Sequence, residues 1–111
     1  MSVTINDLGK FEDYLYFSSD IDRYIKTLSD KDKEKFNDNR INFSKELSKL
    51  RQGQLELVTK KIEEASSKLQ QGIDNMERQI TSLQNVATIL NTFSQMLSVV
   101  VGIVSFVASH P

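Results

Sequence analysis

The sequence predicts an all-α fold: an elongated helical hairpin or coiled-coil-like bundle with short amphipathic helices at its N-terminus. Three observations lead to this fold class. Apolar residues recur at every seventh position from residue 55 to residue 104, the chain has one proline and four glycines, and no charged residue follows Arg78. A seven-residue repeat is typical of a helix seam, and the scarcity of Gly and Pro permits long helices. The length of 111 residues predicts a single domain, residues 1–111.

The seven-residue repeat forms an unbroken apolar ladder. Its rungs are Leu55, Ile62, Leu69, Met76, Leu83, Leu90, Leu97 and Val104. A second column lies three residues before each rung from Ile62 onward and is partly apolar. It holds Thr59, Ser66, Ile73, Ile80, Ala87, Ser94 and Val101. With a third apolar column beside them, the stripe is wider than a two-stranded coiled coil needs, which indicates a helix in a bundle. We expect the ladder to be the seam that binds a second copy or a helical partner.

Residues 7–28 are expected to form one or two short amphipathic helices. Thr4 and Asp7 have the spacing of a capping box, in which each side chain bonds the backbone N–H of the other residue. Ser19 and Asp22 have the same spacing and predict the start of a second short helix. The aromatic residues in this part of the chain lie at helical spacing, which favours a place in the core over a docking patch.

Residues 30–71 are expected to form one long, charged amphipathic helix. Ser29 and Asp32 have capping-box spacing and predict its first turn. Near Gly53 the apolar register slips, because the series that runs through Phe36 and Leu50 gives way to the ladder. A slip of this kind at a glycine indicates a local kink in the helix.

A second break is expected at Gly72. A glycine followed by an apolar residue is typical of a helix end, and Asp74 and Glu77 have the spacing of a new helix start. A break there makes residues 30–71 and 74–109 the two arms of an antiparallel hairpin. The ladder keeps its phase through Gly72, however, and the alternative is one continuous rod over residues 55–108, about 80 Å long.

The C-terminal helix carries one narrow polar row. The row consists of Gln84, Thr88, Asn91, Gln95, Ser98, Gly102, Ser105 and Ser109, which follow one another at steps of four and three. In a soluble bundle we expect this row to be the exposed face of an otherwise buried helix. In a bilayer, Ser98, Gly102 and Ser105 would form the small-residue face at which membrane helices approach closely.

Residues 86–108 are uncharged and long enough to cross the core of a bilayer as a helix. Polar residues interrupt the first half of this segment, and it lacks the basic flank and the Trp or Tyr anchors that are typical of spanning helices. Insertion of this helix into a membrane, as a tail anchor or as an element of a helical pore, is therefore the alternative function.

The sequence predicts no enzyme, cofactor site, metal site or small-molecule substrate. The single histidine, His110, lies beside the last residue, and the carboxylate pairs Glu63–Glu64 and Asp20–Asp22 have no partner histidine. The chain has no Cys, and its glycines are too scattered to form a phosphate loop. Its 14 basic and 15 acidic residues are interleaved, so nucleic-acid binding is not expected. The first ten residues lack the features of a secretory signal peptide.

We therefore expect a non-enzymatic helical interaction module that self-associates or binds a helical partner. A helix that is apolar on three sides needs more cover than a chain of this size easily supplies. The size and helical-hairpin pattern are similar to those of small secreted proteins of bacterial export systems. The Trp-x-Gly turn of one such group is missing, because the chain has no Trp. This similarity concerns general shape alone and implies no site residues.

Overall fold

The computed structural model describes residues 3–84 and 86–110, and within these ranges the secondary structure is entirely helical. The described residues form six α-helices. They are α1 (Ile5–Phe17), α2 (Ser19–Lys26), α3 (Asp30–Gln52), α4 (Leu55–Glu64), α5 (Ser66–Ser82) and α6 (Val86–Ser109). The predicted all-α class is confirmed.

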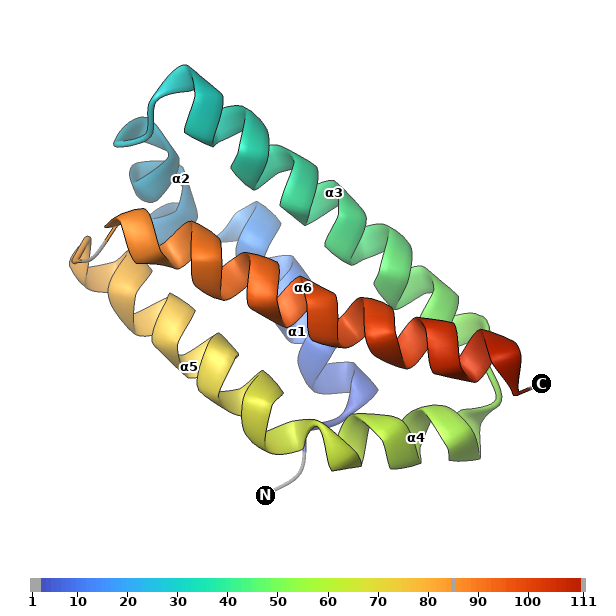
Figure 1. Cartoon of the computed structure of the whole chain (residues 1–111). Helices are drawn as coiled ribbons and strands as arrows, with labels where there is room; N and C mark the ends of the chain where they lie inside the picture. The colour runs from blue at the N-terminus through green and yellow to red at the C-terminus, as the bar shows by residue number, and fades with distance from the viewer. Residues whose placement is uncertain (1–2, 85, 111) are drawn as a thin grey trace.

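Helix α6 lies between α3 and α5, with α1 behind it and its other side uncovered (Figure 1). Helix α4 crosses near the C-terminal end of α6, and α2 packs on α5. The principal dimensions of the bundle are 42 × 27 × 21 Å. The continuous 80 Å rod is therefore not found, and the elongated, coiled-coil-like form of the prediction is not confirmed.

Helices α1, α2 and α3 start at polar caps, two of which the sequence predicts. Thr4 and Asp7 form a complete capping box at the start of α1, with N···O distances of 2.9 and 3.2 Å. The Ser29 hydroxyl accepts a hydrogen bond from the Asp32 N–H at the start of α3. For α2 the prediction is wrong by one residue, because Ser18 rather than Ser19 provides the cap.

The long helix predicted over residues 30–71 is divided into three. Helix α3 ends at Gln52, and Gly53 takes an extended conformation, so the chain turns where the sequence analysis expected only a kink. A Cβ at Gly53 would lie 2.8 Å from Val107 of α6, so the glycine lets the end of α6 pack against this turn. A second break falls at Ala65, between α4 and α5.

The predicted hairpin turn at Gly72 is wrong. Gly72 lies inside α5 and is buried. A Cβ at this position would meet the side chain of Met96 in α6, with the sulfur only 2.6 Å away. The glycine is therefore explained by the close approach of two helices, and not by a change in backbone direction. Helix α5 consequently continues across the predicted boundary between residues 71 and 74.

The chain reverses instead at Leu83, between α5 and α6. Leu83 has φ 55° and ψ 31°, and it is the one non-glycine residue with positive φ among those described. Its N–H donates to the Ile80 carbonyl, and the Gln84 N–H donates to the Gln79 carbonyl, so the last turn of α5 is closed. The predicted helix 74–109 is thus split between the end of α5 and the whole of α6.

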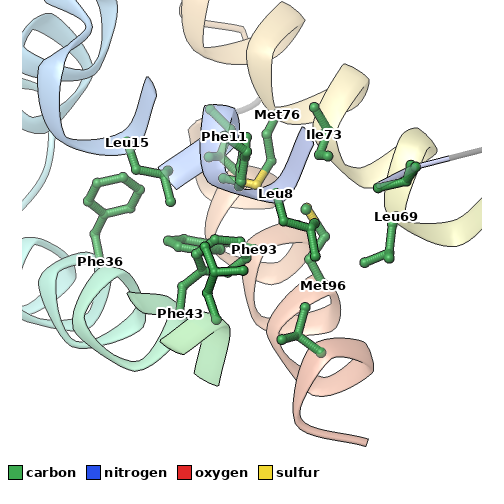
Figure 2. Packing of buried hydrophobic residues seen from close by; sticks show 14 of the residues in the cluster. Leu8, Phe11, Leu15, Phe36, Phe43, Leu69, Ile73, Met76, Phe93 and Met96 are labelled. Carbon is green, nitrogen blue, oxygen red and sulfur yellow. The ribbon is translucent and has the colours of Figure 1, made fainter. Parts of the chain in front are cut away.

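The core is built around Phe93 of α6, which is fully buried. Its ring centroid lies 5.5 Å from that of Phe36, and 6.3 Å from those of Phe11 and Phe43 (Figure 2). Edge-to-face and tilted ring pairs of this kind stabilise a core beyond the burial of their surface. The N-terminal half of the chain thus supplies aromatic rings that cover the inner face of α6. Tyr16 and Phe17 are exceptions, because both are exposed.

Candidate interaction surface on α6

The polar row of the C-terminal helix lies on the outer face of α6, away from Phe93. All eight residues of the predicted row are exposed. We call this set the outer row; it comprises Gln84, which precedes the helix, and Thr88, Asn91, Gln95, Ser98, Gly102, Ser105 and Ser109. The row is exposed, as expected, but the rest of α6 is not fully buried, because Ala87, Val101 and Ala108 are exposed as well.

The outer face of α6 is uncharged and low in relief near its C-terminal half. A Cβ at Gly102 would have no other group within 4 Å, so the glycine serves no packing purpose within the monomer. Ser98 and Ser105 flank it at helical spacing and are also exposed. Val101 is 40 % exposed at the edge of the row. A helix face without charge or bulky side chains allows the backbone of another helix to approach closely.

The apolar ladder does not form one continuous seam in the folded chain. Ile62, Leu69 and Met76 are buried in the core, whereas Leu55 is 70 % exposed at the start of α4. The four later rungs follow the end of α5. Leu83 lies in the turn, Leu90 is buried, and Leu97 and Val104 are only half-buried. The rungs Ile62, Leu69 and Met76 therefore share the core. The rungs on α6 do not continue their line, because the chain reverses at Leu83.

The two heptad columns continue into α6 as a strip beside its buried face, which we call the heptad flank. The flank consists of Ala87, Leu90, Ser94, Leu97, Val101, Val104 and Ala108, and only Leu90 among them is fully buried. The Ser94 hydroxyl accepts a hydrogen bond of 3.2 Å from the Asn39 amide of α3, so the flank lies on the α3 side. The flank therefore offers apolar surface that the bundle covers only in part.

The C-terminal end of α6 is held by a charged side chain that the sequence analysis did not single out. The ammonium group of Lys61 in α4 lies 3.8 Å from the centroid of the Phe106 ring, and the His110 ring stacks on Phe106 with centroids 4.0 Å apart. Cation–π contacts of this kind hold an aromatic ring in place. Because 45 residues separate Lys61 from Phe106, no local motif could have predicted the contact.

A polar junction joins α2 to the end of α5. Asp20 accepts a hydrogen bond of 3.0 Å from the Thr81 hydroxyl and one of 3.1 Å from Arg23. Arg23 also donates to the Thr81 carbonyl over 3.0 Å, which places a cation at the C-terminus of α5. The sequence analysis found Asp20 only as part of a carboxylate pair without a partner histidine; in the structure Asp20 fixes α2 on α5.

Two titratable groups beside this junction, Tyr14 and Glu77, have raised pKa values. Burial raises the pKa of Tyr14 to about 12, and the nearby carboxylates of Glu77 and Asp20 add to the shift. A phenol with this pKa is neutral at pH 7 and is a poor base or nucleophile. Burial, and then Asp74, raise the pKa of Glu77. Across residues 3–84 and 86–110, no three His, Asp or Glu side chains are grouped so that they could hold a metal ion.

Helix α6 is also the one helix among the described residues that is long and apolar enough to cross a membrane. The core helix of a soluble bundle can have the same length and composition, so these two properties do not distinguish the alternatives. Only 28 % of the most apolar 18-residue stretch of α6 is buried.

Comparison of the chain with protein-family models, with curated proteins and with solved structures found no match.

Proposed function

We propose that this protein is a non-enzymatic helical interaction module, which self-associates or binds a helical partner through α6. Packing of the coiled-coil type between α6 and that partner is part of the proposal. The observation that carries it is the uncharged outer face of α6 around Gly102. A glycine and Val101 are exposed there, and the packing of the monomer does not require a glycine at this position.

Two properties of this face favour a helix as the partner. The outer row is straight, because its residues repeat at steps of four and three along one helix. It also offers no charge, so a charged partner would lose hydration without gaining an ion pair. A second uncharged helix with small side chains fits both properties, and α6 of another copy is one such helix.

The test is a charge placed where it cannot disturb the monomer. Gly102→Glu adds a side chain in open space and replaces glycine with a better helix former, so the monomer should become slightly more stable. The same carboxylate would be buried in a helix–helix contact, so association should weaken by at least tenfold. Sedimentation equilibrium gives the association constant, and urea unfolding gives the stability.

The matched control is Ser48→Glu, which adds the same charge at an exposed position in the middle of α3. This variant should associate as the wild type does. Equal weakening by Ser48→Glu and Gly102→Glu would mean that net charge, and not the face of α6, controls association. Unchanged association of Gly102→Glu would exclude the outer row as the contact surface.

A second candidate function is insertion of α6 into a bilayer. The observation in its favour is the uncharged, apolar length of α6 and the small part of it that the bundle buries. Insertion would require α6 to leave the aromatic cage around Phe93, so it would involve opening of the bundle.

Flotation of the full chain with phosphatidylcholine vesicles, with and without anionic lipid, separates the two functions. The interaction module should stay in the aqueous fraction as a defined oligomer. Recovery of the wild-type chain with the vesicles, resistant to high salt and lost in Gly102→Glu, would favour insertion, because a charge near the middle of a bilayer is costly.

A further inference from the structure

The turn between α5 and α6 is built from a residue that does not suit it. Leu83 adopts the left-handed conformation (φ 55°), in which the Cβ of an L-residue crowds the backbone. Helix ends of this kind usually carry glycine at this position. A right-handed conformation at Leu83 would remove the strain and would also extend α5 toward α6.

The heptad columns run through this turn without a slip. Met76, Leu83 and Leu90 are consecutive rungs, although the chain reverses at the middle one. When a turn separates two antiparallel helices, the seven-residue repeat of one helix need not continue in the other. In one continuous helix it must continue, because only then do the apolar residues share one face. The closed fold therefore gives no reason for the phase, and a straight α5–α6 helix would.

A straightened helix cannot leave α6 in water, because Phe93, Met96 and Val100 would lose their burial. The one site described here that fits this inner face is the groove that α6 leaves empty in another copy of the chain. We propose that the connection at Leu83 is a hinge: α5 and α6 join into one helix, and α6 packs into the bundle of a second copy, which returns its own α6.

The exchange keeps most of the monomer intact. Asp20 and Arg23 hold the end of α5 to α2 through Thr81, so the hinge lies on the α6 side of a fixed point. The joined helix, residues 66–109, would be about 66 Å long, against 42 Å for the longest dimension of the monomer. Short, strained connections favour exchange of this kind. The inference rests on the self-association proposed above, and it places the contact on the inner face of α6 instead of the outer row.

The absence of cysteine allows a direct test. Asn39→Cys and Ser94→Cys place one thiol on α3 and one on α6, at side chains that lie 3.2 Å apart in the monomer. The full-length double variant is concentrated near its unfolding midpoint, returned to buffer, and separated into monomer and dimer. A short bis-maleimide then joins the thiols, and a denaturing gel reports which chains are linked.

The exchange predicts that the isolated dimer gives covalent dimers, because each α6 lies on the α3 of the other copy. A dimer whose links all lie within single chains would overturn the exchange and leave association through the outer row intact. A chain that stays monomeric at every concentration would overturn the exchange and the proposed self-association together.

Variants at the hinge give a second test. Leu83→Gly relieves the strain of the closed turn and disfavours the straight helix, which should weaken the exchanged dimer about fivefold for each of its two hinges. Leu55→Gly, at the exposed start of α4, is the matched control and should leave the dimer unchanged. Since Leu83→Gly also removes a half-buried side chain, a third variant carries two glycines inserted after Gln84. Dimers of undiminished affinity in both hinge variants would overturn the proposal.

Discussion

The same substitution at two glycines should change stability in opposite directions. Gly72 and Gly102 each lie within a helix, α5 and α6 respectively, and neither has positive φ. Gly72→Ala would place a methyl group against Met96, whereas Gly102→Ala would place one in open space. Because the helix-propensity gain is common to both, the difference between them isolates the packing of α5 on α6.

The magnitudes follow from the two environments. Replacing a glycine inside a helix by alanine contributes about 1 kcal/mol to the free energy of unfolding. Gly102→Ala should keep this gain, which corresponds to an increase in Tm of about 4 °C. Gly72→Ala adds the cost of overpacking, about 1–3 kcal/mol, so its net effect should be a loss of up to about 2 kcal/mol. The flexible Met96 side chain keeps this cost below that of a rigid clash.

Urea unfolding of the two variants, at a concentration where the wild type is monomeric, measures both effects. The dependence of stability on urea concentration should stay the same, so that the midpoints can be compared directly. Equal gains at both positions would refute the close approach of α5 and α6 at Gly72. A loss at Gly102 in the monomer would refute its place in open space.

The remaining predictions concern the core, the N-terminal segment and pH. Phe93→Ala should cost about 3–5 kcal/mol in urea unfolding, since it empties the centre of the aromatic cluster; a loss below 1 kcal/mol would contradict that position. Ser66→Ala leaves the buried Val3 N–H without its 3.0 Å acceptor and should cost about 1–3 kcal/mol, whereas Ser67→Ala on the exposed face should be neutral. The raised pKa of Glu77 means that the folded state binds the proton more tightly, so the stability from protonation is present below pH 4.5 and is lost as pH rises through the folded pKa. Glu77→Gln should therefore stabilise the protein at pH 7 and have no effect at pH 3.5; equal effects at both pH values would contradict the shift.

Local signals in the sequence were sufficient for the fold class and for the starts of α1 and α3. Thr4 and Ser29 cap helices as predicted, because a capping box depends on residues only three positions apart. The outer row was also found, because one helix face is set by residue spacing alone.

The course of the chain could not be predicted, because it depends on contacts between distant residues. Gly72 has the local features of a helix end, and only the position of Met96, 24 residues later, makes it a helix-packing glycine. Leu83 has no local feature of a turn, since leucine rarely takes left-handed φ. The turn is stabilised by the burial of α6 against α3 and α5, and not by the residue that forms it.

The candidate site was predicted in part for the same reason. The identity of Ser98, Gly102 and Ser105 as small residues on one face follows from the sequence, but their exposure depends on which side of α6 the bundle covers. The ladder was predicted as a single seam, yet its rungs are divided between the core and the flank, because the reversal at Leu83 separates α5 from α6.

The measurement that tests the central claim most directly is the mass of the wild-type chain in detergent-free buffer, by sedimentation equilibrium from micromolar to millimolar concentration. If the outer face and flank of α6 bind a second helix, the mass should rise with concentration from one chain to a defined oligomer. A mass that stays at 12.7 kDa over the whole range would contradict self-association through α6.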